Sequence, residues 1–301
     1  MSLLQKVQAK ANQLGGIAQS VGKVLRSLSK IREALGRIEA RQLATVGGGD
    51  LTAQEFQVYS QWGEDGIIQH LLRHVGVPRK LFVEFGVEDY TEANTRFLVV
   101  NNDWAGLVLD GGDANIGAIR RDEIYWRHNL KAVQAFITRE NINDLLREHG
   151  VTGEIGILSI DIDGNDYWVW EAIDAVAPAI VIVEYNSRFG PERAVTVPYD
   201  PGFVRHKAHH SCAYYGASLT ALVALGKRKG FAFVGSNRAG NNAFFVRREL
   251  LATPLRELTV AEGYVQRQFR ETRDSDGRLT FPTPEEEAAL VGSLPLVEVP
   301  R

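Results

Sequence analysis

Four short apolar segments, each ending in an acidic residue, constrain the fold of this chain more than any other feature of its sequence. Segments with helical periodicity separate them, and short buried strands that alternate with helices predict a doubly wound, Rossmann-like α/β sheet. The predicted strands span residues 80–85, 105–110, 155–162 and 179–185. The predicted helices span residues 64–74, 92–101, 142–149, 167–175 and 218–229. Residues 231–235 and 243–247 predict a hairpin that closes the sheet.

The acidic residues at the strand ends are Glu84, Asp110, Asp161 with Asp163, and Glu184. Ligands of an open parallel sheet bind beyond the carboxyl ends of its strands. Carboxylates that converge there repel one another unless they face cations, amines or hydroxyl groups. We therefore expect a binding site for such groups at this edge, although single members of the set could instead cap the following helix.

The first two strand ends predict a nucleoside ligand that carries no phosphate. Asp110 follows Gly86 by 24 residues, the spacing at which an acid binds ribose hydroxyls in nucleoside-binding α/β folds. The turn over residues 84–90 lacks the G-x-G-x-x-G pattern that holds a pyrophosphate, and its additional acids would repel one. This argues against NAD, FAD and ATP and favours a nucleoside with a cationic tail, such as S-adenosylmethionine.

Four segments together resemble the class I S-adenosylmethionine-dependent methyltransferases, and in particular FkbM-type and related O-methyltransferases of sugars and natural products. The segments are SQWGEDG at 60–66, FVEFG at 82–86, LSIDIDGND at 158–166 and VEYN at 183–186. The resemblance covers about residues 56–248. The chain departs from it after Gly86, where Thr91 or a neighbour followed by Asn94 replaces the later glycine of the E/D-x-G-x-x-x-G motif.

The resemblance and the strand-end argument together give a set of candidate site residues. The expected cofactor-binding residues are Gln61, Glu64, Glu84, Gly86, Asn94, Asp110 and Asp161. The expected reaction is methylation of a hydroxyl group on a sugar, glycan or glycosylated natural product. Asp163 is the first candidate for the base, followed by His209 and His210 in the only histidine cluster.

A metal ion is an open possibility at the same edge. Asp161, Asp163 and Glu184 offer the hard oxygen ligands that Mg²⁺ prefers. Asp161-x-Asp163 also fits a metal-dependent glycosyltransferase, which is the alternative enzyme class. The alternative outside enzymes is a scaffold that keeps the methyltransferase fold without turnover.

The first 49 residues form a basic arm with a heptad repeat. Leu14, Val21, Leu28 and Leu35 lie seven residues apart, and an Ile or Val follows each of them by three. Leu3 and Val7 extend this apolar seam toward the N-terminus. A period of 3.5 residues is typical of coiled coils, and the Leu and Ile positions favour a homotetramer or homotrimer over a dimer. The alternatives are a helix packed on its own domain and a helix on an anionic membrane surface.

Charge and cysteine content bear on partners and compartment. The chain has a net charge of −3, but residues 1–49 carry +6 and the remainder −9. An acidic body and an arm without aromatic residues argue against nucleic acid as a partner. The single Cys212 excludes an internal disulfide and favours a reducing compartment, so we expect a cytoplasmic protein. The expected organisation is an arm over 1–46, a linker over 47–55, a methyltransferase domain over 56–250 and a C-terminal extension over 251–301.

Overall fold

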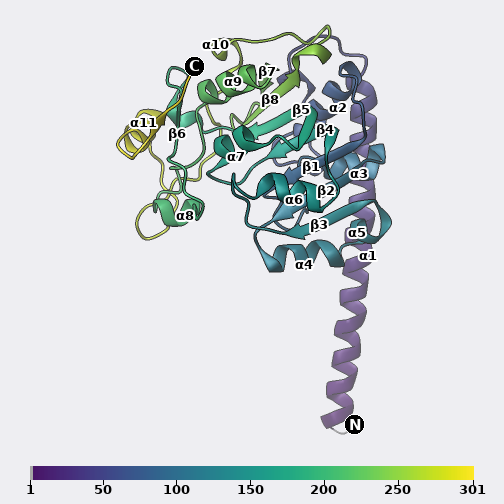
Figure 1. Ribbon diagram of the computed structural model, residues 1–301. Helices are drawn as coiled ribbons and strands as arrows, with labels where there is room; N and C mark the ends of the chain where they lie inside the picture. Colours follow the sequence, from purple (N-terminus) through teal and green to yellow (C-terminus); the bar gives the residue numbers. More distant parts are fainter. Residues whose placement is uncertain (1–2) are drawn as a thin grey trace.

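In the computed structural model, which describes residues 3–301, a seven-stranded sheet lies at the centre of the body and one long helix runs along its side (Figure 1). The sheet order is β3-β2-β1-β4-β5-β8-β7. The strands are β1 (Leu81–Phe85), β2 (Ala105–Asp110), β3 (Leu130–Gln134), β4 (Gly153–Ile160), β5 (Val176–Glu184), β7 (Phe231–Ser236) and β8 (Asn242–Arg247). The first five are parallel, whereas β8 pairs with β5 and β7 in antiparallel register.

The predicted doubly wound α/β sheet and its closing hairpin are thereby confirmed. The order of the strands reverses between β1 and β4, which is the topological switch point at which ligands bind in such sheets. Of the seven strands in the central sheet, only β3, at the sheet edge, was not predicted. Its alternating exposure, with Lys131 and Gln134 in solvent, interrupts the apolar run that marks the buried strands.

Helices cover both faces of the sheet because successive strand residues point to opposite sides. Phe82 belongs to one apolar cluster and Val83 to the other. One face carries α2 (Glu64–His74), α3 (Arg96–Asn102), α4 (Asp113–Arg121) and α5 (Glu123–Arg127). The opposite face carries α6 (Ile142–Glu148), α7 (Asp166–Ala172) and α9 (Leu219–Arg228). None of the helices in the described part of the chain combines the length and hydrophobicity that a membrane span requires.

The segment that follows the sheet packs back onto the body. Tyr185 Oη donates a hydrogen bond to the Val265 carbonyl at 2.7 Å, and Val299 lies in the same apolar cluster as α7 and α9. The remaining short elements are η1 (Thr52–Gln54), η2 (Ser187–Phe189), β6 (Val195–Thr196), α8 (Arg205–Ala208), η3 (Arg248–Leu250), α10 (Val260–Gly263), α11 (Pro284–Gly292) and β9 (Val297–Glu298). Residues 251–301 therefore share their core with the sheet domain.

The N-terminal helix α1 (Leu3–Leu43) extends beyond the body (Figure 1). Its C-terminal part packs against α2 and α3, and its N-terminal half projects past the sheet. Gly36 lies at the tightest contact, because a Cβ atom there would stand 2.3 Å from the Val58 side chain. The predicted helical arm is thus present. The side chains of Leu3 and Val7, which extend the predicted seam, lie outside the described side chains.

Candidate functional site

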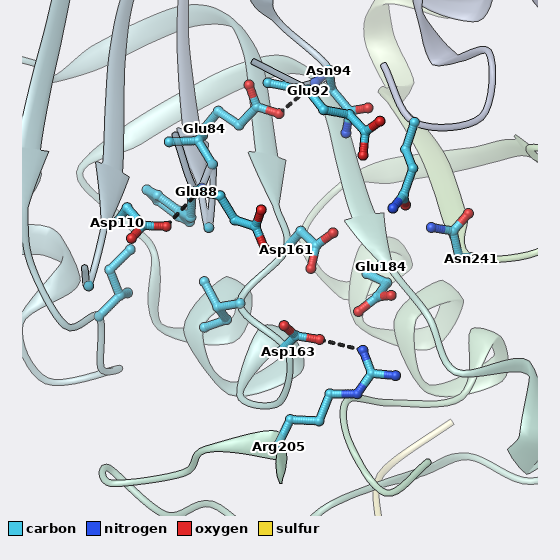
Figure 2. Close-up of a pocket in the computed structure, with 18 of the residues that line it drawn as sticks. Glu84, Glu88, Glu92, Asn94, Asp110, Asp161, Asp163, Glu184, Arg205 and Asn241 are labelled. Atoms are coloured by element: carbon cyan, nitrogen blue, oxygen red, sulfur yellow. Dashed lines mark hydrogen bonds and ion pairs between the residues drawn. The ribbon is translucent and has the colours of Figure 1, made fainter. Parts of the chain in front are cut away.

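A cavity of about 600 Å³ opens at the carboxyl ends of β1, β2, β4 and β5, across the switch point (Figure 2). Residues after these strands form its floor, and residues 241–242 and 269–271 close one side. Two guanidinium groups, those of Arg205 and Arg270, are the only basic side chains among the described residues that line it. Eight carboxylates also line it, those of Glu84, Glu88, Glu92, Asp110, Asp161, Asp163, Glu184 and Glu271. The cavity therefore favours cations and hydroxyl groups and disfavours phosphate.

The carboxylate of Glu84, at the end of β1, accepts hydrogen bonds from the loop that precedes α3. Its Oε1 accepts a hydrogen bond from Asn94 N at 2.9 Å, and its Oε2 accepts hydrogen bonds from Thr95 N at 3.1 Å and from Thr95 Oγ1. Burial raises the pKa of Glu84 to about 7, although the hydrogen bonds from Thr95 and Asn94 oppose this rise. The side chain thus fixes the start of α3 and the position of Asn94 on the cavity wall.

Asp110, at the end of β2, is nearly saturated by hydrogen bonds. Its Oδ1 accepts from Gly112 N at 2.7 Å and from Asn115 Nδ2 at 2.9 Å, and its Oδ2 accepts from Glu88 N at 2.9 Å. A carboxylate offers about four acceptor positions, so about one position of Oδ2 remains for a ligand. Glu88 has a left-handed backbone (φ 48°), which a non-glycine residue adopts rarely and mostly at functional sites.

Gly86 joins the two halves of the site. Its φ is +68°, and a Cβ atom at this position would stand 1.6 Å from the carbonyl oxygen of Asp161. No side chain fits between the two loops, so only glycine allows the end of β1 to approach the end of β4 this closely.

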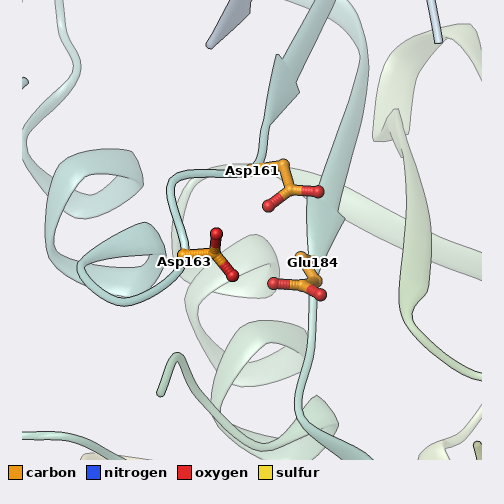
Figure 3. Close-up of side chains that lie close together, drawn as sticks. All are labelled: Asp161, Asp163 and Glu184. Carbon is orange, nitrogen blue, oxygen red and sulfur yellow. The ribbon is translucent and has the colours of Figure 1, made fainter. Parts of the chain in front are cut away.

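Asp161, Asp163 and Glu184 form a tight carboxylate cluster at the ends of β4 and β5 (Figure 3). One oxygen from each lies within 4.8 Å of the others. Glu184 is 6% exposed; Tyr215 Oη lies 3.3 Å from its Oε1, whereas its buried Oε2 has no hydrogen-bond partner among residues 3–301. The pKa values of Asp161 and Glu184 are raised well above their ordinary range, because burial and the neighbouring carboxylates disfavour the charged forms. Among the described residues, no ion pair reaches Asp161 or Glu184.

One cation does reach the edge of this cluster. Arg205, on α8, donates a hydrogen bond to Asp163 Oδ1 at 2.6 Å (Figure 2). It also pairs with Glu271 Oε2 at 2.5 Å. Its guanidinium group also stacks on the Tyr215 ring, 3.7 Å from the ring centre. Arg205 thus connects the acidic floor to the C-terminal segment that closes the cavity.

The structure brings most of the predicted site residues to the cavity wall. Those that line it are Gln61, Glu84, Gly86, Asn94, Asp110, Asp161, Asp163 and Glu184. Glu64 lies behind the wall, because its carboxylate is fully buried and accepts hydrogen bonds from Trp62 N, Asn237 Nδ2 and Asn242 Nδ2 at 2.7–2.9 Å. Glu64 therefore supports the loop that carries Gln61 instead of lining the cavity.

His209 and His210 also do not line the cavity. The His209 ring pairs with Ser211 Oγ at 2.7 Å through Nδ1, and its centre lies 4.2 Å from that of His210. Arg205, four residues before His209, lines the cavity instead. The two histidines predicted as candidate bases thus do not reach the cavity wall, where Arg205 lies instead.

Several wall residues are not among the predicted site residues. Trp62 and Phe269 stack with ring centres 5.1 Å apart and an interplanar angle of 19°, and both line the cavity. Phe136, which is 51% exposed, lines the side next to Gly111. Arg205 and Glu271 complete this set. Of these residues, only Trp62 belongs to a segment, SQWGEDG, that carries the resemblance described above.

The solved structures similar to this chain include methyltransferases. The pyocyanin biosynthetic protein PhzM is 17% identical with a TM-score of 0.37, and the match covers 60% of this chain and 53% of PhzM. The chain thus spans about half the length of PhzM. An S-adenosylmethionine-dependent methyltransferase from Clostridium acetobutylicum ATCC 824 is 6% identical with a TM-score of 0.40, and the match covers 61% and 89% of the two chains.

A third similar structure is the N-terminal domain of EvdMO1 with S-adenosylhomocysteine bound, which is 13% identical with a TM-score of 0.35 over 55% of this chain and 72% of that one. No protein-family model matches the sequence, and the search of curated proteins also found no match. With TM-scores below 0.5, the function has to be argued from the site itself.

Proposed function

We propose that this protein is an S-adenosylmethionine-dependent methyltransferase of class I that methylates a hydroxyl group. The observation that carries the proposal is the cavity at the switch point, where eight carboxylates outnumber two guanidinium groups and Asp110 keeps one acceptor position. Such a lining suits a nucleoside whose tail is cationic, and it repels a diphosphate. The four sequence segments that resemble class I methyltransferases support the same assignment.

The residues at the ends of β1, β2 and β3 would hold the cofactor. Asp110 offers its free position to one ribose hydroxyl, and Phe136 offers an exposed ring next to Gly111 for stacking of the base. Glu88 supplies negative charge for the sulfonium and amino groups, and the Asp161 carboxyl offers oxygen acceptors to the amino group. When bound, the cofactor supplies an activated methyl group.

The residues at the ends of β4 and β5 would act on the acceptor, which we propose is a hydroxyl of a sugar, glycan or glycosylated product. A carboxylate of the cluster removes the hydroxyl proton while the oxygen accepts the methyl group and the carbon–sulfur bond breaks. Raised pKa values make Asp161 and Glu184 stronger bases than ordinary carboxylates. Trp62 and Phe269 provide an apolar surface of the kind on which a sugar ring stacks.

The carboxylate cluster also fits a divalent cation. The orphaned Oε2 of Glu184 and the proximity of three carboxylates are the features that such an ion would satisfy. Asp161, Asp163 and Glu184 would hold Mg²⁺, which would lower the pKa of an acceptor hydroxyl bound to it. In its absence, Arg205 is the cation that neutralises Asp163.

Calorimetric titration with S-adenosylhomocysteine tests the proposal. We expect binding by the full chain, and we expect Asp110→Asn to weaken it by about 10- to 100-fold, the loss of a hydrogen bond to a charged group. Asp113→Asn is the matched control, since Asp113 is an exposed acid three residues away that does not line the cavity.

Two results would overturn the proposal. If the wild-type chain bound no S-adenosylhomocysteine, the cofactor assignment would be wrong. Binding of a nucleotide sugar with Mn²⁺ in its place would support the metal-dependent glycosyltransferase instead. If the cofactor bound but no methyl group passed to any of a panel of sugars, glycans and glycosylated products, the scaffold alternative would stand.

A further inference from the structure

The N-terminal helix α1 carries two separate faces, and only one of them contacts the body. On the body side, Tyr59 Oη donates a hydrogen bond to Glu33 Oε1 at 2.7 Å and lies 3.3 Å from Ser29 Oγ. The guanidinium group of Arg32 stacks over the Tyr59 ring at 4.5 Å, and Gly36 lies against Val58 and Phe97. The body thus binds α1 over roughly its last four turns.

The other face is an apolar seam that no described part of the chain covers. It consists of Leu14, Ile17, Val21, Val24, Leu28, Ile31, Leu35 and Ile38, each 50–61% exposed. The seam stays exposed next to the body as well as in the projecting half, because Leu35 and Ile38 are as exposed as Leu14 and Ile17. The fold of the single chain therefore leaves an unbroken apolar stripe in water.

The geometry of the helix excludes the body as the partner of this seam. The seam occupies the first and fourth positions of each heptad. The body contacts Ser29, Gly36 and Leu43 at the second position, Glu33 and Ala40 at the sixth, and Arg32 at the fifth, beside the seam. In a coiled coil the second and sixth positions lie on the outside. The body is thus attached at positions that leave the seam free for other helices.

Four basic side chains of α1 also lie on the side of the helix that faces away from the seam. Lys23, Lys30 and Arg37 occupy the third heptad position and Arg26 the sixth, so these basic side chains lie away from the seam. Identical helices can therefore approach along the seam without bringing these like charges together. The eight side chains expose roughly 700 Å² of apolar surface per chain, close to the ~800 Å² per partner of a stable interface.

We propose that the α1 seam binds the seams of other copies of this chain in a coiled coil, with the bodies arranged around its outside. This inference goes beyond the proposed enzymatic activity and does not depend on it. Leu at the first heptad position and Ile at the fourth favour three or four chains over two. Apart from Leu25, the exposed large apolar side chains of α1 fall on two heptad positions, a stripe too narrow for a helix that lies on a membrane and presents a broad apolar face.

Sedimentation velocity and light scattering of the full chain test this. We expect the wild-type protein to have three or four times the 33.4 kDa mass of one chain. The double variant Val24→Asp/Ile31→Asp places two charges in the seam and should have the mass of a single chain. The double variant Lys23→Asp/Lys30→Asp introduces the same side chains one position earlier, on the outside, and should keep the wild-type mass.

Two further measurements make the result unambiguous. Near-ultraviolet circular dichroism should be the same for all three proteins, because the seam does not contact the body. Flotation with vesicles that contain phosphatidylserine tests the membrane alternative. A wild-type protein that is monomeric, or that binds these vesicles through the seam, would overturn the proposal, as would a seam variant that keeps its assembly.

Discussion

The acidic residues on the two sides of the switch point are similar in sequence but differ in their surroundings. Glu84 and Asp110, on the β1–β2 side, each accept three or more hydrogen bonds, mostly from backbone amides. On the β4–β5 side, Glu184 accepts one hydrogen bond and Asp161 accepts none from the described residues. The first pair mainly builds loops, with one acceptor position of Asp110 left for the proposed cofactor, whereas the second pair keeps most of its oxygens for a ligand. Hydrogen-bond satisfaction, more than burial, distinguishes a structural acid from an available one.

The largest effect is expected where an available acid is removed. Glu184→Gln keeps the size and the Tyr215 contact but removes the charge, so we expect methyl transfer to slow by about 10²–10⁴-fold, the range of a lost general base. Affinity for S-adenosylhomocysteine should change by less than a factor of about three, well under 1.4 kcal/mol. Single-turnover assays and calorimetry measure the two quantities. An equal loss of affinity would show that the two sides are not separate.

A smaller effect, on stability instead of catalysis, is expected for Glu84→Gln. The amide nitrogen of Gln would face the Asn94 or Thr95 amide, so a buried donor would lose its acceptor. We expect the free energy of unfolding to fall by about 1–3 kcal/mol, measured by urea denaturation. Glu88→Gln is the control, because Glu88 lines the cavity and its side chain holds no loop. Equal stability of Glu84→Gln and the wild type would contradict the loop-building role.

Binding of Mg²⁺ should depend on pH in a direction that the raised pKa values determine. Asp161 and Glu184 must lose their protons to bind a cation, and their raised pKa values keep them protonated to higher pH than ordinary carboxyls. The increase in melting temperature caused by millimolar Mg²⁺ should thus be near zero at pH 5 and reach a few degrees at pH 8.5. Differential scanning calorimetry measures this shift, and Glu184→Gln should abolish it. A shift that is larger at pH 5 would exclude this site.

The smallest effect is expected from the arginine at the boundary of the cluster. Arg205 competes with a metal ion for Asp163, so Arg205→Gln should tighten Mg²⁺ binding severalfold. Glu271→Gln is the matched control, since it breaks the other ion pair of Arg205 and leaves the contact with Asp163. Isothermal titration with Mg²⁺ compares the two variants. Weaker binding by Arg205→Gln alone would mean that the arginine supports the cation site.

The sequence predicts those parts of the site that depend on local order along the chain. Each acid that ends a buried strand reaches the cavity because parallel strands deliver their carboxyl ends to one edge. The chain route after β5 is not encoded in such a local pattern. Arg205, at the start of α8, lines the site in place of His209 and His210. Residues 269–271, which close one side of the cavity, lie more than 80 residues after Glu184 in the sequence.

The contact between Gly86 and the Asp161 carbonyl also has an evolutionary consequence. Position 86 admits no other residue while the two loops keep this spacing, whereas at Gly111 the nearest atom to an added Cβ would lie 3.6 Å away. Changes in the loop after β1 and changes in the loop after β4 are therefore linked at one backbone crossing. Among related chains, a change of residue at position 86 should occur only together with a rebuilt β4 loop, while position 111 varies freely.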